Sequence, residues 1–370
     1  MYGMRNEKQH IDLNEKTVLV TGSPGFIGAN LVLRLLSDTD VIRSGKVISL
    51  DNMNDYYDPK LKDYRLSQIN AMRSSVSHEF IEGSIADKAL VDWIFAEYKP
   101  DVVVNLAAQA GVRYSIDHPD VYIESNLIGF YNILEACRHS YGGNDADYIG
   151  VQHLIYASSS SVYGGNKKVP FSTDDKVDNP VSLYAATKKS DELLAYSYSK
   201  LYNIPSTGLR FFTVYGPAGR PDMFYYSATQ KLVKGETISI FNYGDMKRDF
   251  TYVDDIVEGI VRVMQGAPKK AIGDDGLLIP AYALYNIGGG NPENLLSFIS
   301  TLQEELVRAK VLPEDYDFDG HRELIGMQPG DVPMTYADSK GLEEDYGFKP
   351  SIDIRTGLRK FCEWYKTYYG

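Results

Sequence analysis

Segments of strand length alternate with helical segments through the first half of this 370-residue chain. Strand–helix alternation of this kind predicts a parallel sheet with helices on both faces, which is an α/β doubly wound fold. The predicted strands are Thr17–Thr21, Val47–Asp51, His78–Glu82, Asp101–Asn105, Gln152–Ser158 and Ser206–Phe212, and the predicted helices include Gly25–Ser37, Lys88–Tyr98, Pro119–His139 and Leu183–Tyr202.

The first predicted strand runs into a glycine-rich turn with the spacing G-x-x-G-x-x-G, from Gly22 through Gly25 to Gly28. Glycine at these places permits a tight turn, a close backbone approach to a pyrophosphate, and close packing of the helix on the strand. The helix that follows offers free N–H groups and a partial positive charge to phosphates. The segment therefore predicts dinucleotide binding in a Rossmann-like domain.

The second predicted strand ends in Asp51, 23 residues after Gly28. A carboxylate at this place can accept hydrogen bonds from both hydroxyls of the adenosine ribose, and it would repel a 2′-phosphate. Asp51 therefore favours NAD over NADP as the cofactor.

Tyr184 and Lys188 lie four residues apart and so share one face of a predicted helix. A nearby ammonium favours the phenolate form of a tyrosine, which can then take a proton from a sugar hydroxyl. The spacing alone is not selective, because six Tyr-x-x-x-Lys pairs occur in the chain. Only Tyr184 begins a helix soon after a strand that ends in a run of hydroxyls, Ser158–Ser161. Ligands of doubly wound sheets bind at the carboxyl ends of strands, so we expect this pair at the active site.

The net charge of −12 disfavours nucleic acid as a partner, because its binding needs a basic surface. Cys137 and Cys362 form no metal-ligand spacing, and we expect no metal site and two reduced thiols in a cytoplasmic protein. No apolar run reaches membrane-spanning length, so we expect no membrane partner. The polar start, Met1–Lys16, is interpreted as a short frayed leader, and Tyr141–Gly150 as a surface loop.

The alternation breaks after about residue 210, where shorter elements rich in Gly, Pro and Tyr follow. We predict a Rossmann-like NAD-binding domain over 1–210 and a smaller mixed α/β substrate domain over 211–370. The segment Phe250–Met264 is predicted to be helical and to return to the first domain, which makes the boundary discontinuous.

Together these residues resemble the extended short-chain dehydrogenase/reductase family, in its sugar-nucleotide epimerase and dehydratase branch. The resemblance extends from Lys16 to Tyr368. It is carried by Val20–Gly28, Asn105–Arg113, Ser158–Gly164, Tyr184–Lys188 and Arg210–Pro217. Further stretches resemble UDP-glucuronate 4-epimerases, namely Gly219–Met223, Met246–Ile256, Met327–Pro333 and Phe348–Pro350.

The resemblance implies a role for each matching residue. Ser159 would hydrogen-bond the oxygen on carbon 4, Tyr184 would be the general base, and Lys188 would support it and reach the nicotinamide ribose. Ser160, Ser161 and Thr213 would hold a sugar carboxylate through neutral donors. The implied NAD-binding residues are Gly22, Gly25, Phe26, Ile27, Gly28, Asp51, Asn52, Ala107 and Lys188, and the remaining substrate-binding residues are Arg113, Arg220, Arg248 and Asp331.

Two positions depart from the family pattern. Ser84 occupies the place of an aspartate that touches adenine, which puts that contact in doubt. Gln328 occupies the place of an arginine that grips phosphate in hexose epimerases, and Arg220 would compensate for its loss.

The implied reaction is NAD-dependent 4-epimerisation of UDP-glucuronate to UDP-galacturonate through a transient 4-keto sugar. Alternatives are a UDP-glucuronate decarboxylase, a 4-epimerase of UDP-glucose or a UDP-N-acetylhexosamine, and an NAD-sensing binder without activity. A 4,6-dehydratase is disfavoured, because such relatives carry an Asp-Glu pair where this chain has Ser160 and Ser161. Relatives commonly form homodimers through two helices per subunit, which here would be Pro119–His139 and Leu183–Tyr202.

Overall fold

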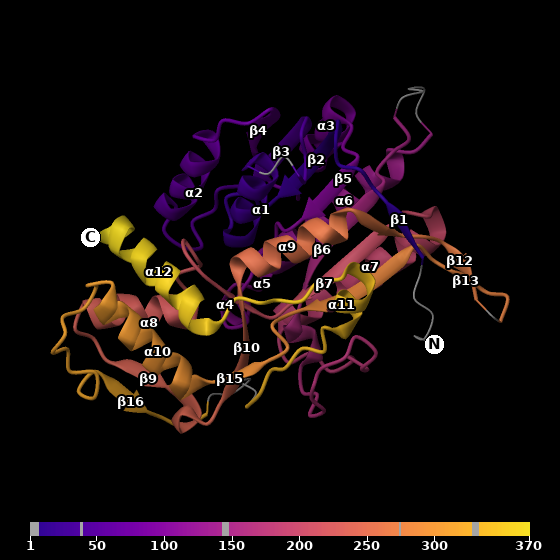
Figure 1. Cartoon of the computed structure of the whole chain (residues 1–370). Helices are drawn as coiled ribbons and strands as arrows, with labels where there is room; N and C mark the ends of the chain where they lie inside the picture. The colour runs from indigo at the N-terminus through magenta and orange to yellow at the C-terminus, as the bar shows by residue number, and fades with distance from the viewer. Residues whose placement is uncertain (1–6, 38–39, 143–147, 274, 328–332) are drawn as a thin grey trace.

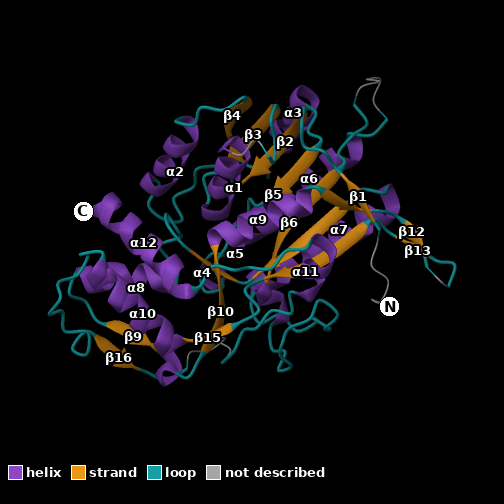
Figure 2. Cartoon of the chain, viewed as in Figure 1, coloured by secondary structure: helices purple, strands orange, loops and turns teal. Residues whose placement is uncertain are grey.

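A computed structural model of the chain describes residues 7–37, 40–142, 148–273, 275–327 and 333–370. Its centre is a parallel sheet of seven strands, which confirms the predicted α/β fold class (Figures 1 and 2). The strands, in their order across the sheet, are β14 (Tyr282–Ile287), β7 (Ser206–Phe211), β6 (His153–Ser159), β5 (Val102–Asn105), β2 (Lys16–Thr21), β3 (Gly45–Asp51) and β4 (Val76–Glu82).

Helices cover both faces of this sheet because its strands are apolar on both sides. In β2, Val18 and Val20 pack into one buried cluster and Leu19 packs into the other, as the two-residue period of a strand requires. The first cluster includes residues of α1 (Phe26–Ser37), α2 (Lys60–Asn70) and α9 (Val253–Met264), and the second includes residues of α3 (Lys88–Tyr98), α6 (Gly129–His139) and α7 (Leu183–Tyr202).

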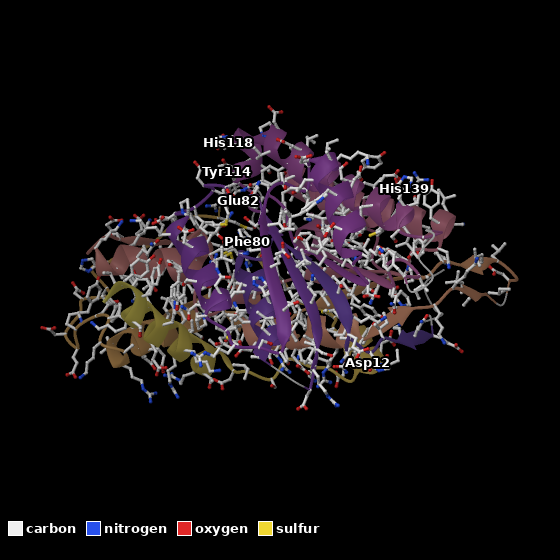
Figure 3. All side chains as sticks on the ribbon, turned by 90° about the horizontal axis from the view of Figure 1, so that it is seen from above. Asp12, Phe80, Glu82, Tyr114, His118 and His139 are labelled. Atoms are coloured by element: carbon white, nitrogen blue, oxygen red, sulfur yellow. The ribbon has the colours of Figure 1, made fainter. Side chains whose placement is uncertain are left out.

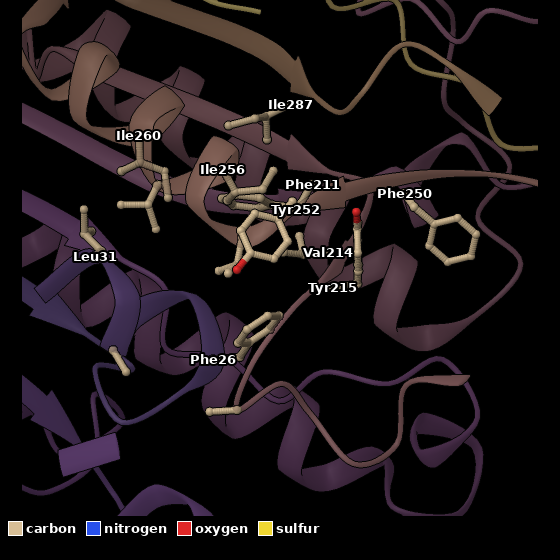
Figure 4. Close-up of a cluster of buried hydrophobic side chains, with 14 of the residues drawn as sticks. Phe26, Leu31, Phe211, Val214, Tyr215, Phe250, Tyr252, Ile256, Ile260 and Ile287 are labelled. Carbon is tan, nitrogen blue, oxygen red and sulfur yellow. The ribbon is translucent and has the colours of Figure 1, made fainter. Parts of the chain in front are cut away.

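The chain returns to the first lobe from its C-terminal half. Figure 4 shows Ile256 and Ile260 of α9 beside Leu31 of α1 and Ile287 of β14, and all four side chains are buried in one cluster. The strand β14 also pairs in parallel with β7 along its whole length, from Tyr282 opposite Ser206 to Ile287 opposite Phe211. The predicted boundary at residue 210 stays a prediction, and α9 and β14 are among the elements beyond it that pack against or pair with the first lobe.

A smaller group of elements packs below the sheet in the view of Figure 1. It has an aromatic core in which Phe250 stacks on Phe298 with ring centroids 4.0 Å apart, and Tyr225 meets Phe361 edge-on at 4.7 Å. Its elements are β8 (Thr213–Tyr215), α8 (Phe224–Val233), β9 (Ile238–Ile240), β10 (Lys247–Tyr252), β15 (Pro292–Asn294), α10 (Leu295–Arg308), β16 (Arg322–Leu324) and α12 (Ile354–Tyr369).

The remaining elements are short and lie around the seven-stranded sheet and the smaller group of elements. They are β1 (Lys8–His10), α4 (Tyr114–Asp117), α5 (Pro119–Tyr122), β11 (Gly266–Pro268), β12 (Ala271–Ile272), β13 (Leu278–Ile279) and α11 (Lys340–Tyr346). Within the described residues, no helix combines the length and apolar character that a membrane span needs.

Two local predictions need correction. Residues 250–252 belong to β10 rather than to a helix, because Phe250, Thr251 and Tyr252 pair in parallel with β8 and the helix begins only at Val253. The supposed leader is ordered where it is described, since β1 pairs with β11 and the Leu13 side chain is fully buried. The helix predicted over 119–139 is confirmed with these bounds, as α5, a π-helical segment over 123–128, and α6. In the loop predicted over 141–150, residues 143–147 lie outside the described residues.

Candidate active site

A cavity of about 600 Å³ opens at the carboxyl ends of the strands of the sheet. In open parallel sheets this edge is where ligands bind, because the strand ends and the following helix starts converge there. The cavity is lined by residues that follow β2, β3, β5, β6 and β7, by the first turns of α7, and by a segment of the second lobe around residues 213–223. Both lobes therefore contribute side chains to one site.

The glycine-rich turn forms one wall of the cavity and depends on the absence of side chains. Gly22 has a φ of +71°, and a Cβ there would lie 2.7 Å from the backbone nitrogen of Ala107. A Cβ on Gly28 would overlap the carbonyl oxygen of Gly22. In the first turn of α1 the Ala29 N–H donates to the Gly25 carbonyl, whereas the N–H groups of Phe26, Ile27 and Gly28 precede this first helical bond and can donate to a phosphate. This wall fits the pyrophosphate of a dinucleotide.

Asp51 lies at the end of β3 and lines the cavity beside Asn52. Its Oδ1 accepts hydrogen bonds from the Met53 N–H at 2.7 Å and from the Lys62 ammonium at 3.1 Å. Both contacts use the same oxygen, so Oδ2 is available to a ribose hydroxyl. The Lys62 contact was not predicted, because it joins a strand end to α2 and no sequence spacing marks it.

A run of hydroxyls follows β6. Ser159 Oγ accepts the N–H of Ser161 at 3.1 Å and so caps the short 3₁₀ turn Ser160–Tyr163. Ser159, Ser160 and Ser161 all line the cavity, as does Thr213 at the start of β8. These four hydroxyls come from two lobes and can hydrogen-bond one ligand.

Tyr184 and Lys188 lie in the first turns of α7, which the Ser182 side chain caps by accepting the Ala185 N–H. Both residues line the cavity. The Lys188 ammonium is buried and donates hydrogen bonds to the Ala157 carbonyl at 2.9 Å and to Asp191 Oδ2 at 3.1 Å. A lysine has three such donors, so one is left for a ligand.

A buried ion pair fixes α7 against the sheet one turn beyond Lys188. Arg210 of β7 donates two hydrogen bonds to Glu192, at 2.7 and 2.8 Å, and Ser158 donates a third at 2.7 Å. Burial raises the pKa of the Glu192 carboxyl, but the Arg210 guanidinium outweighs burial and holds that pKa below its usual range. The pair therefore anchors α7 to β6 and β7 near their carboxyl ends.

Arg220 approaches the cavity from the second lobe and forms a two-point ion pair with Asp222, at 3.0 and 2.6 Å. Tyr56, from the segment after β3, donates a hydrogen bond to the same Asp222 carboxylate at 3.3 Å. Burial, with the charge of Asp222, raises the pKa of Tyr56 to about 12. All three residues line the cavity, and together they join its two lobes.

Arg65 of α2 holds together two segments that border the cavity, the glycine-rich turn and the segment that carries Arg220. Its guanidinium donates hydrogen bonds to the Pro24 carbonyl in the glycine-rich turn, at 2.9 Å, and to the Ala218 carbonyl just before Arg220, at 2.6 and 2.8 Å. It is almost fully buried, yet forms no ion pair among the described residues. Arg65 therefore joins the turn that would hold a dinucleotide to the segment that carries Arg220.

Comparison with known proteins agrees with this geometry. Residues 18–288 match the model of the NAD dependent epimerase/dehydratase family. The chain belongs to this family. It is accordingly an NAD-dependent enzyme of the epimerase type, as the resemblance in the sequence implied.

Several relatives align with almost the whole chain. UDP-glucuronate 4-epimerase 4 of Arabidopsis thaliana is 43% identical over 96% of this chain and 76% of its own length. Protein CapI of Staphylococcus aureus is 45% identical over 95% of this chain and 99% of its own. The crystal structure of UDP-glucuronic acid 4-epimerase from Bacillus cereus, in complex with UDP-glucuronic acid and NAD, has a TM-score of 0.77 at 29% identity and covers 95% of this chain and all of its own.

Most of the residues that the sequence singled out in this family member line one cavity. They are Gly22, Gly25, Phe26, Ile27, Gly28, Asp51, Asn52, Ala107, Ser159, Ser160, Ser161, Tyr184, Lys188, Thr213 and Arg220. Ser84, the departure at the adenine position, is also in the lining. The roles given to these residues stay predictions.

Two predicted substrate residues do not line this cavity. The Arg113 guanidinium lies over the ring of Phe241, 5.2 Å from its centroid, just before α4. Figure 3 shows the neighbouring Tyr114 and His118 side by side, and their rings stack at 4.1 Å. Arg248 lies on β10 and donates to the Lys247 carbonyl. Asp331 and Gln328 lie outside the described residues.

Proposed function

We propose that this enzyme interconverts UDP-glucuronate and UDP-galacturonate by inverting carbon 4 of the sugar. The observation that carries the proposal is the cluster of neutral hydroxyls from Ser160, Ser161 and Thr213 in the cavity that also holds Tyr184. Neutral hydroxyl donors can bind a carboxylate in place of an arginine. An acidic sugar is therefore the substrate that the site supports best.

The protein's own groups in this reaction hold and move a proton. NAD, when bound against the glycine-rich turn and Asp51, supplies the reversible two-electron exchange with carbon 4. Tyr184 takes the proton of the carbon-4 hydroxyl and later returns it, while the Lys188 ammonium favours the phenolate that does so. Ser159 donates a hydrogen bond to the carbon-4 oxygen and keeps it within reach of Tyr184. The sugar turns in the cavity between the two halves of the reaction.

The oxidised sugar is a β-keto acid, which loses carbon dioxide when its carboxylate bond aligns with the ketone π system. Donors on two sides of the carboxylate can prevent that alignment. Ser160 and Ser161 come from the 3₁₀ turn that follows β6, whereas Thr213 comes from β8. We assign these three side chains to the restraint that separates an epimerase from a decarboxylase.

The diphosphate needs cationic or N–H donors elsewhere in the cavity. Arg220 is the cation that faces it from the second lobe, and Asp222 and Tyr56 hold its guanidinium in place. We assign Arg220 to the diphosphate. Arg113, Arg248 and Asp331 stay predicted substrate contacts.

One incubation tests the proposal. The purified protein is given UDP-glucuronate without added reductant, and the product is identified by mass and NMR. A product of unchanged mass with inverted carbon 4 is expected. A product lighter by one carbon dioxide would mean a decarboxylase, and conversion of UDP-glucose but not UDP-glucuronate would mean a neutral-sugar epimerase.

The chain offers a matched control for the role of Tyr184. Tyr196 and Lys200 have the same spacing on the same helix, but Tyr196 is exposed and outside the cavity lining. We expect Tyr184→Phe to abolish conversion and Tyr196→Phe to retain it. Full conversion by Tyr184→Phe would overturn the mechanism, and absence of conversion by the wild type on any UDP-sugar would favour a binding protein.

We further propose that two copies of the chain pair through α6 and α7. Exposed apolar side chains gather on these helices and the adjoining π-helical segment, where a monomer would leave them in water. They are Ile123, Ile128, Tyr131, Leu193, Tyr196, Leu201 and Tyr202. Because α7 also carries Tyr184 and Lys188, such pairing would stiffen the site.

A further inference from the structure

Asp191 is a buried carboxylate that touches Lys188 from behind the cavity. Its Oδ2 lies 3.1 Å from the Lys188 Nζ, and the two side chains are 2% and 3% exposed. Its other oxygen, Oδ1, is buried and has no hydrogen-bond partner among the described residues. Most buried polar side-chain atoms in proteins have at least one hydrogen-bond partner. The unpartnered Oδ1 of Asp191 is therefore an exception, and we ask what its negative charge does to Lys188.

Asp191 does not line the cavity, so it can act on the reaction only through Lys188. Lys188 is also bound to the Ala157 carbonyl, and it faces the cavity beside Tyr184. Taking an ammonium out of water favours its neutral form, whereas a carboxylate in contact opposes this. The contact is thus placed to keep Lys188 charged.

The other polar groups near this pair have partners of their own or carry no charge, so Asp191 is the group that can balance the positive charge of Lys188. On α7, Glu192 is engaged by Arg210, Lys189 and Ser158. On β6 and β14, Tyr156 and Tyr282 hydrogen-bond each other at 2.7 Å and carry no charge in the neutral range.

We propose, on the basis of the function proposed above, that Asp191 is a positioning residue that holds Lys188 in its ammonium form above neutral pH and so keeps Tyr184 competent there. Burial raises the pKa of Asp191 to about 7, with Lys188 pulling in the opposite direction. Above that pH the carboxylate is charged and supports the ammonium. Below it the carboxyl is neutral and no longer supports the ammonium.

The sharpest test is Asp191→Asn, which keeps the shape of the side chain and removes its charge. Loss of a negative charge makes every neighbouring acid release its proton more easily. The alkaline limb of the kcat profile should therefore move to lower pH by about one unit, while the profile below neutral pH keeps its shape. Asp191→Ser, a second neutral replacement, should move the limb in the same direction.

The control is Asp92→Asn, which removes the same charge from an exposed Lys88–Asp92 pair on α3 and should leave the profile unchanged. A uniform loss of kcat at all pH values in Asp191→Asn would mean a purely structural role and would overturn the proposal.

A second readout needs no turnover and separates this proposal from the proposed function. Phenolate absorbance is titrated in the NAD-bound protein and in its Tyr184→Phe counterpart, and the difference reports Tyr184 alone. The same difference is measured in the Asp191→Asn background, where the Tyr184 titration should occur at lower pH. Identical titrations in both backgrounds would refute the role of Asp191, whereas lack of conversion by the wild type would refute only the proposed substrate.

Discussion

The Arg210–Glu192 pair offers a stability prediction with a defined pH dependence. The two side chains are 1% and 2% exposed and share two short hydrogen bonds. In Arg210→Met the side chain keeps a similar volume, but the buried Glu192 carboxylate is left with Lys189 as its one ion-pair partner among the described residues. Removing one partner of a buried pair typically costs about 3–5 kcal/mol. We expect a loss of unfolding free energy of this size at pH 8.

The sign of the pH dependence follows from the two pKa directions. In the wild type the pKa of Glu192 lies below its usual range, so its stabilisation is present above the unfolded value of about 4.3 and is lost as the pH falls through the folded value. In Arg210→Met burial dominates, and the carboxyl takes up a proton as the pH falls. The destabilisation by the substitution should therefore be smaller at pH 5 than at pH 8, by at least about 1 kcal/mol.

Urea unfolding followed by intrinsic fluorescence, at both pH values, measures this difference. The double variant Arg210→Met/Glu192→Met provides the control, since replacing both partners by apolar groups of similar volume is often neutral. Equal destabilisation at pH 5 and pH 8 would refute the reasoning. So would a double variant as unstable as Arg210→Met alone, because the cost would then not come from an unpaired carboxylate.

Three further predictions follow from single contacts. Gly28→Ala should weaken NAD binding by about tenfold or more, measured by NAD content and titration, because its Cβ overlaps the turn, and Gly165→Ala, with open space around its Cα, should not. Arg65→Met should raise KM for the UDP-sugar more than it lowers kcat, and a purely kcat effect would contradict its role beneath the Arg220 segment. Leu193→Glu should convert a dimer to a monomer in sedimentation, because pairing would bury its charge, whereas Leu277→Glu, equally exposed outside α6 and α7, should leave the assembly unchanged.

Features that depend on neighbours along the chain could be predicted from the amino-acid sequence alone. The six strands predicted from the sequence and the helices 88–98 and 183–202 agree with the structure within a residue or two, because apolar periodicity and capping residues act locally. The short strand β1 was not predicted. The glycine-rich turn was predicted for the same reason, since its tight geometry comes from three glycines within seven residues. The spacing of Tyr184 and Lys188 was equally visible, although five other pairs shared it.

Contacts between distant segments became visible only in the folded chain. The strand β14 completes the sheet by pairing with β7, although about 70 residues separate them in the chain. Helix α2 brings Lys62 to the cavity and Arg65 to the Pro24 and Ala218 carbonyls, and no sequence spacing marks either contact. Tyr56 meets Asp222 across 166 residues. The burial of Lys188 beside Asp191 is also a result of packing, and residue spacing alone does not predict it. Periodicity specifies which face of an element is apolar, whereas packing determines which distant groups share a low-dielectric site.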